Sequence, residues 1–113
     1  VMSCGSLPTG DEFAVLSERR REHLVLALFG ELDLATAPAL EQQLEAVWAS
    51  DAPALVLDLE GLAFIDSTGL RLILHAQRRA LAEEKGFSLR RLPRQAQRVF
   101  EVVGLTGRVP VDR

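Results

Sequence analysis

Residues 54–59, with the sequence ALVLDL, are apolar at nearly every position. Such a run is typical of a central strand that is buried on both faces of a sheet. Helical patterns stand on both sides of it, at 36–48 and from 70 onwards. Strands that alternate with helices pair in parallel through right-handed crossovers, and the helices pack on the sheet. The chain is therefore expected to be an α/β protein with a mostly parallel sheet.

The other apolar patterns extend this order to β-β-α-β-α-β-α-β, in which the first two strands form a hairpin and make the sheet mixed. Thr36 is expected to cap the helix at 36–48, and Lys85-Gly86 ends the next helix, whose apolar face includes Leu70 and Leu81. Pro93 opens a short third helix that Gly104 closes. The remaining strands are expected at 12–17, 23–30, 87–92 and 108–111. The core is expected to include Leu26, Leu28, Val56, Leu57, Ile73, Leu74 and Phe100.

The length and composition of the chain exclude several classes of protein. With 113 residues it forms one domain, expected over 12–113, preceded by a flexible extension at 1–11. Its single cysteine, Cys4, cannot form an internal disulfide, which fits a reducing compartment. No run approaches the roughly 18 apolar residues of a membrane span. A cytoplasmic protein without membrane contact is expected, and the net charge of −3 does not favour binding of nucleic acid.

The motif Asp66-Ser67-Thr68-Gly69 stands where an apolar stretch enters a helix. Either Asp66 or Ser67 can cap that helix. Gly69 weakens a first helical turn, so it indicates a close backbone approach or an unusual dihedral angle. The strands at 23–30 and 54–59 are expected to be parallel neighbours, and functional loops gather at the carboxyl ends of parallel strands. Asp33 and Ser67 are therefore expected at one rim of the molecule.

Enzyme chemistry around this motif is not supported. An aspartic protease motif has one residue fewer between its aspartate and glycine, and a serine hydrolase needs a glycine two residues before Ser67. His75 lies about 12 Å along the helix from Ser67, too far for a general base. The sequence has no phosphate-binding glycine loop and no clustered metal ligands. We expect no catalytic residue, cofactor, metal or small-molecule substrate, which leaves Ser67 as a helix cap or as the substrate of another protein.

The stretches GELDLATAPAL (30–40), LVLDLEGLAFIDSTGLRLIL (55–74) and VFEVVGL (99–105) resemble the STAS family. Within it, the chain is similar to the anti-sigma factor antagonists of bacterial partner-switching systems, over roughly residues 12 to 109. The resemblance implies a regulator of transcription that binds an anti-sigma factor with serine-kinase activity and releases the sigma factor. Phosphorylation by that kinase switches the antagonist off, and a separate phosphatase resets it.

Carried over by position, the resemblance implies that Ser67 is phosphorylated, with Thr68 as the competing acceptor. It also implies that Asp33, Asp66, Ser67, Thr68 and Gly69 contact the partner. The family usually ends in an amphipathic helix, and this chain ends three residues after Pro110, so either the sequence is truncated or this member dispenses with that helix. The alternative is a STAS scaffold or transporter-regulating subunit without a phosphorylation cycle.

Overall fold

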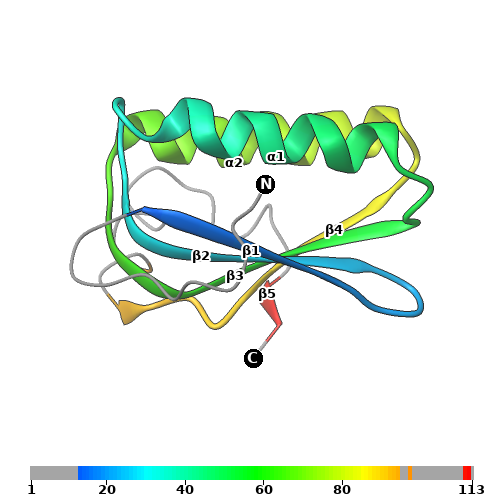
Figure 1. The fold of residues 1–113 in the computed structure, drawn as a ribbon, viewed down its shortest axis with the longest axis horizontal. Helices are drawn as coiled ribbons and strands as arrows, with labels where there is room; N and C mark the ends of the chain where they lie inside the picture. Colours follow the sequence, from blue (N-terminus) through cyan, green and yellow to red (C-terminus); the bar gives the residue numbers. More distant parts are fainter. Residues whose placement is uncertain (1–12, 95–96, 98–110, 113) are drawn as a thin grey trace.

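The computed structural model describes residues 13–94, 97 and 111–112 of the chain. In that part, two helices lie side by side on one face of a five-stranded sheet (Figure 1). The elements in chain order are β1 (Ala14–Arg19), β2 (Leu24–Leu32), α1 (Ala37–Ala49), β3 (Ala54–Ile65), α2 (Ser67–Ala82), β4 (Gly86–Arg90) and β5 (Val111–Asp112).

The sheet is mixed, as the sequence predicted. The strands lie in the order β1-β2-β3-β4-β5, with β1 antiparallel to β2 and the other pairs parallel. The expected parallel pairing of the strands at 23–30 and 54–59 is therefore confirmed. Strand β5 lies at the edge of the sheet, and residues 108–110 of the strand expected at 108–111 lie outside the described residues.

Strand β3 is longer than the sequence predicted. The expected strand ended at residue 59 and was followed by a loop, but residues 60–65 continue the pairing with β2 as far as Leu32–Ile65. Two register shifts interrupt this pairing, so the apolar pattern loses its regular alternation and no longer resembles a strand. Gly61 lies at one of them, and a Cβ atom there would collide with the ring of Phe29.

The core lies between the sheet and the two helices. Leu26, Leu28, Leu57 and Ile73 are fully buried, as expected, whereas Val56 and Leu74 are half-buried. Strands β2 and β3 and helices α1 and α2 contribute most of the core. Its residues include Leu28, Leu32, Leu55, Leu57, Leu59, Leu40, Leu44, Val47, Leu70, Ile73 and Ala76.

The prediction for Leu81 is wrong, because its side chain is 80% exposed. Leu81 belongs to the last turn of α2, where Ala80 takes the buried position. Arg94 and Gln97 are helical, and the Gln97 amide donates to the carbonyl of Pro93 (2.9 Å). The rest of the predicted third helix, Phe100 and the extension at 1–11 lie outside the described residues. Neither α1 nor α2 is long and apolar enough to span a membrane.

Candidate functional site

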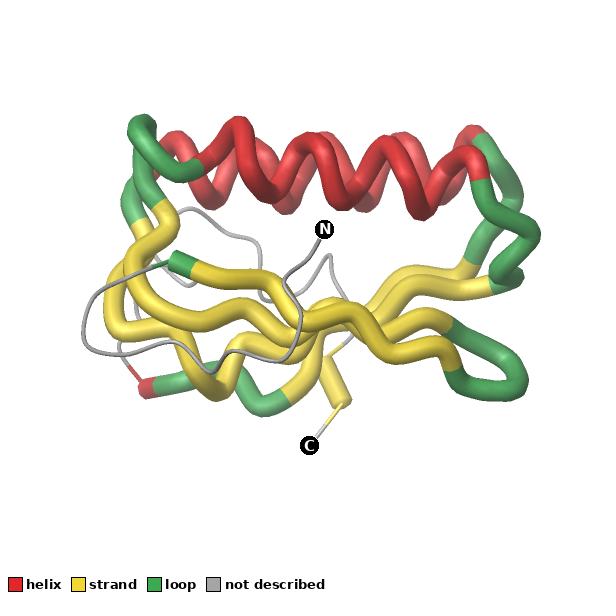
Figure 2. The backbone as a smooth tube through the Cα atoms, viewed as in Figure 1, coloured by secondary structure: helices red, strands yellow, loops and turns green. Residues whose placement is uncertain are grey.

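Strands β2 and β3 end next to each other, and this brings the residues that follow them together. Leu32 pairs with Ile65, and the Asp66 amide donates to the carbonyl of Leu32 (3.2 Å). Asp33 and Asp66 therefore follow directly after paired residues. Figure 2 shows the connections into both helices at the same edge of the sheet. The expectation that Asp33 and Ser67 share one rim is confirmed.

Asp66 is the cap of α2. Its carboxylate Oδ1 accepts a hydrogen bond from the Gly69 amide (3.0 Å), and its carbonyl accepts one from the Leu70 amide (3.0 Å). The Ser67 side chain is exposed, and its hydroxyl makes no hydrogen bond to any of the described residues. The choice between Asp66 and Ser67 is thus settled in favour of Asp66, and the serine hydroxyl is not used by the fold.

This division between the two residues can be tested by unfolding. Asp66→Ala is expected to lower the free energy of unfolding by about 0.5–2 kcal/mol, because the Gly69 amide loses its acceptor. Ser67→Ala, the adjacent control, is expected to change it by less than about 0.5 kcal/mol. Urea denaturation followed by circular dichroism measures both. Equal losses in the two variants would contradict the assignment of the cap.

Gly69 permits the first turn of α2 to lie directly on the ends of β2 and β3. A Cβ atom at this buried position would lie 2.8 Å from Cγ1 of Ile65 and 2.8 Å from Cγ of Leu32. Among the described glycines only Gly30 has a positive φ, so Gly69 is not required for its dihedral angle. Close backbone approach is therefore the reason for the glycine.

The loop after β2 is held by Asp33. Its Oδ1 accepts from the amides of Ala35 (3.0 Å) and Thr36 (3.1 Å). The Thr36 hydroxyl accepts from the Asp33 amide (2.9 Å) and donates to the carbonyl of Glu31 (2.7 Å). Thr36 is the N-cap residue of α1, as predicted, but its hydroxyl turns back towards the loop and its side chain makes no cap hydrogen bond.

Two exposed apolar side chains that the sequence pattern did not single out lie close in sequence to these loops. Leu34, in the loop that Asp33 holds, is 74% exposed, and Phe64, near the end of β3, is 50% exposed. The available signal was an apolar residue directly after Asp33 in a segment expected to be a loop. Leu34 gives the rim an apolar contact point on a rigid loop.

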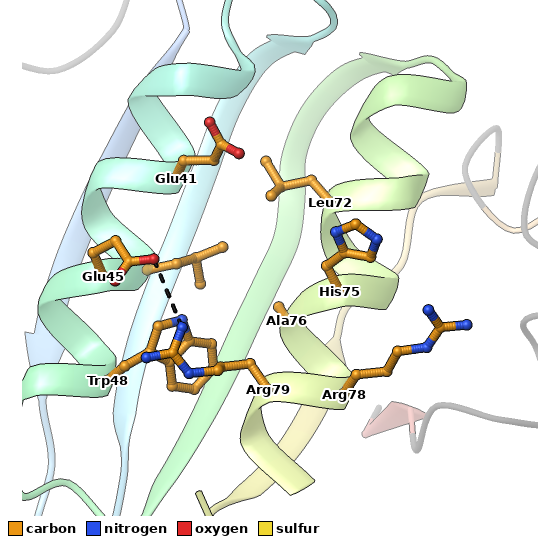
Figure 3. Close-up of a pocket in the computed structure, with 9 residues that line it drawn as sticks. Glu41, Glu45, Trp48, Leu72, His75, Ala76, Arg78 and Arg79 are labelled. Atoms are coloured by element: carbon orange, nitrogen blue, oxygen red, sulfur yellow. Dashed lines mark ion pairs between the residues drawn. The ribbon is translucent and has the colours of Figure 1, made fainter. Parts of the chain in front are cut away.

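A groove of about 440 Å³ lies between α1 and α2 (Figure 3), away from this rim. Arg79 crosses it: its Nη1 lies 3.8 Å from Oε2 of Glu45, and its guanidinium carbon lies 5.7 Å from the ring centre of Trp48. His75 also lines the groove and is exposed. The groove is thus spanned by interactions of the chain itself. In the described part of the chain, no three His, Cys, Asp or Glu side chains could share a metal ion.

A second charged cluster joins β3 to β4. Asp58 is buried and lies 3.6 Å from a guanidinium nitrogen of Arg90. Arg91 pairs with Glu60 (2.7 Å). The hydrogen bond that Arg91 donates to Glu60 and the negative charge of Asp58 raise the pKa of Arg91 above its usual value. Because arginine is protonated at any ordinary pH, this shift predicts no pH-dependent change.

The sequence of the chain matches the family described as "Mlab, STAS domain" over residues 15–111. It is 30% identical, over 91 residues and 80% of both chains, to the anti-sigma-B factor antagonist of Listeria monocytogenes. Its fold is similar to that of an anti-sigma factor antagonist from Mycobacterium paratuberculosis, with a TM-score of 0.82 and 34% identity over 93% of this chain and 89% of the other. It is also similar to the Bacillus cell fate determinant SpoIIAA in its phosphorylated form, with a TM-score of 0.69 and 26% identity over 88% and 92% of the two chains.

Proposed function

Because this chain belongs to the STAS domain family, we propose that it is an anti-sigma factor antagonist, which binds an anti-sigma factor and so releases a sigma factor. The names of two relatives at 30% and 34% identity support this function. A protein of this kind is a regulatory binding protein and not an enzyme. Ser67 is then a substrate for the partner and not a nucleophile of the chain's own chemistry.

The state of Ser67 is proposed to switch the binding. The supporting observation is that its hydroxyl is exposed and unused by the fold, because Asp66 caps α2. In the proposed reaction, Ser67 Oγ attacks the γ-phosphorus of ATP held by the kinase, the bond to ADP breaks, and the hydroxyl proton passes to a base of the kinase. A phosphatase then uses water to hydrolyse the phosphate ester and restores the hydroxyl. The phosphorylated form of SpoIIAA gives this proposal a precedent in a similar fold.

The other proposed site residues support the acceptor and the neighbouring loop. Asp66 fixes the start of α2, and Gly69 lets this turn lie on the ends of β2 and β3. Asp33 fixes the adjacent loop, and Thr68, half-buried in the turn of Ser67, is the competing acceptor. A rim that is rigid before binding loses little conformational entropy when a partner binds it.

The test is to capture the partner and locate the phosphate. The chain is used to co-purify proteins from its source cell, and the complex is incubated with ATP. We expect an anti-sigma factor with kinase activity in the eluate and phosphate on Ser67 in the mass spectrum. Phosphate found only on Thr68 would refute the acceptor. Stable capture of a partner without phosphate on either residue would refute the switch.

Leu34 is expected to contribute to binding of the anti-sigma factor. Leu34→Ser should weaken the affinity about 10-fold, because burial of most of a leucine side chain is worth roughly 1.5–3 kcal/mol and part of it is recovered by the smaller residue. Leu81→Ser is a matched control, since Leu81 is similarly exposed (80% against 74%) but lies at the opposite end of the helix layer. Isothermal titration calorimetry measures both. A loss of equal size in the control would contradict a contact at the rim.

A second candidate is a STAS scaffold or transporter-regulating subunit without a phosphorylation cycle. The description of the matching family, "Mlab, STAS domain", names neither an anti-sigma factor nor a phosphorylation cycle. Under this function Ser67 acts only as a surface residue. Partner binding would then be the same before and after treatment with kinase and ATP.

A further inference from the structure

One face of α2 carries a row of basic side chains that starts at Ser67. Arg71, His75 and Arg78 follow the serine at intervals of four, four and three residues, and all four side chains are exposed. Residues at these intervals lie above one another on a helix. The sequence of α2, STGLRLILHAQRRALA, contains no acidic residue that could neutralise the row from within the helix.

Arg71 differs from the arginine that crosses the groove. Arg79 is engaged by Glu83 (3.0 Å) as well as by Glu45. Arg71 makes no hydrogen bond or ion pair with any of the described residues. It lies one helical turn after Ser67, within reach of the serine side chain.

A phosphate on Ser67 needs such a partner. It adds a charge of about −1.5 to −2 directly beside the carboxylate of Asp66. Asp66 is held in place by the Gly69 amide and cannot turn away without uncapping the helix. An acidic group four residues before a basic one is the favourable order on a helix, and a guanidinium binds phosphate oxygens through paired hydrogen bonds.

We propose that Arg71 binds the phosphate on Ser67 and holds it against α2. This proposal rests on Ser67 as the modified residue. The bound phosphate has a fixed position at the rim, and its charge is offset within the same helix. This ion pair stabilises the phosphorylated antagonist. While Ser67 is unmodified, Arg71 forms no ion pair with any of the described residues.

The test uses chain in which phosphoserine is incorporated at position 67 during translation, so that no kinase is required. Phosphorus NMR measures the pKa of the phosphate in the wild-type chain and in Arg71→Gln. A nearby cation stabilises the dianion and lowers this pKa. Loss of the Arg71 cation in Arg71→Gln is expected to raise the pKa of the phosphate by about 0.3 unit. This shift corresponds to the free energy of a helical ion pair at one-turn spacing. The difference should shrink in 1 M salt.

Arg78→Gln is the matched control, because it removes the same charge from the same row about 16 Å along the helix. Figure 3 shows Arg78 pointing away from α1, so this substitution leaves the Arg79 contacts in place. It is expected to leave the phosphate pKa unchanged. Equal pKa values for wild type and Arg71→Gln, or equal shifts in both variants, would overturn the proposal. Circular dichroism of the unmodified variants verifies that both remain folded.

The result of the phosphorus NMR experiment does not depend on whether the cellular kinase phosphorylates Ser67. A shift confined to Arg71→Gln in the encoded phosphoprotein supports the pair even if the cellular partner phosphorylates another residue. Conversely, kinase-dependent phosphate on Ser67 with no shift in Arg71→Gln would leave the proposed function intact and refute the role of Arg71.

Discussion

Ser67→Asp is expected to weaken binding to the anti-sigma factor more than 100-fold, whereas Ser67→Ala binds like the wild type and resists inactivation by kinase and ATP. A charge that is desolvated and unpaired at an interface, or opposed by a like charge, costs several kcal/mol. A cost of about 3 kcal/mol already corresponds to a factor above 100. The aspartate carries less charge than a phosphate, so the phosphorylated chain is expected to bind still more weakly. Calorimetric titration of purified partner into each variant measures the affinities.

The fold should not change in Ser67→Asp, because an acidic residue in the first turn interacts favourably with the helix dipole. Ala82→Asp serves as a charge control, since Ala82 is exposed at the far end of the same helix. It is expected to leave the affinity within about a factor of two of the wild type. Equal affinities for Ser67→Asp and Ser67→Ala would refute the switch.

Gly69→Val is expected to lower the free energy of unfolding by about 3 kcal/mol, and Gly69→Ala by about 1 kcal/mol. Alanine normally stabilises a helix relative to glycine by about 0.5–1 kcal/mol, so a loss at this position has the opposite sign to helix propensity. The cause is the collision of the new Cβ with Leu32 and Ile65. Both variants should also bind the partner more weakly, because relief of the collision moves the turn that carries Ser67.

A double-mutant cycle isolates this collision. Leu32→Ala removes one of the two side chains that the new Cβ would meet. The penalty of Gly69→Ala is therefore expected to be smaller in the Leu32→Ala background than in the wild type. Thermal or urea unfolding of the wild type, the two single variants and the double variant gives the coupling free energy between the two positions. Equal penalties in both backgrounds would show that Gly69 serves another purpose.

The sequence was sufficient to predict the sheet topology because the two strands that support the site are long and apolar. Residues 54–59 indicated a central strand, and parallel pairing with its neighbour placed Asp33 and Ser67 at one rim. The extent of β3 was not predictable in the same way, since its last residues pair with β2 through two register shifts. Such shifts depend on contacts such as that of Gly61 with Phe29, which periodicity does not contain.

Details of the site depended on competition between nearby groups. Thr36 is a good cap by residue type, but the Glu31 carbonyl and the Asp33 amide engage its hydroxyl. The Asp33 carboxylate accepts the amides of Ala35 and Thr36, which lie in the loop before the helix. The reason for Gly69 became clear only from its distance to Leu32, a residue far away in the sequence. The motif directed attention to Ser67, the proposed acceptor, while the roles of its neighbours in the fold required the three-dimensional arrangement.

The separation of tasks between Asp66 and Ser67 has an evolutionary consequence. The Asp66 carboxylate, and not the Ser67 side chain, provides the cap that stabilises α2. Mutation at position 67 therefore costs little stability. Under the proposed switch, one substitution to alanine would yield a descendant that is permanently active, and one substitution to an acid would yield a permanently inactive one. Lineages would then lose or regain regulation in a single step, whereas a change at Asp66 or Gly69 would need compensating changes in the helix or the strands beneath it.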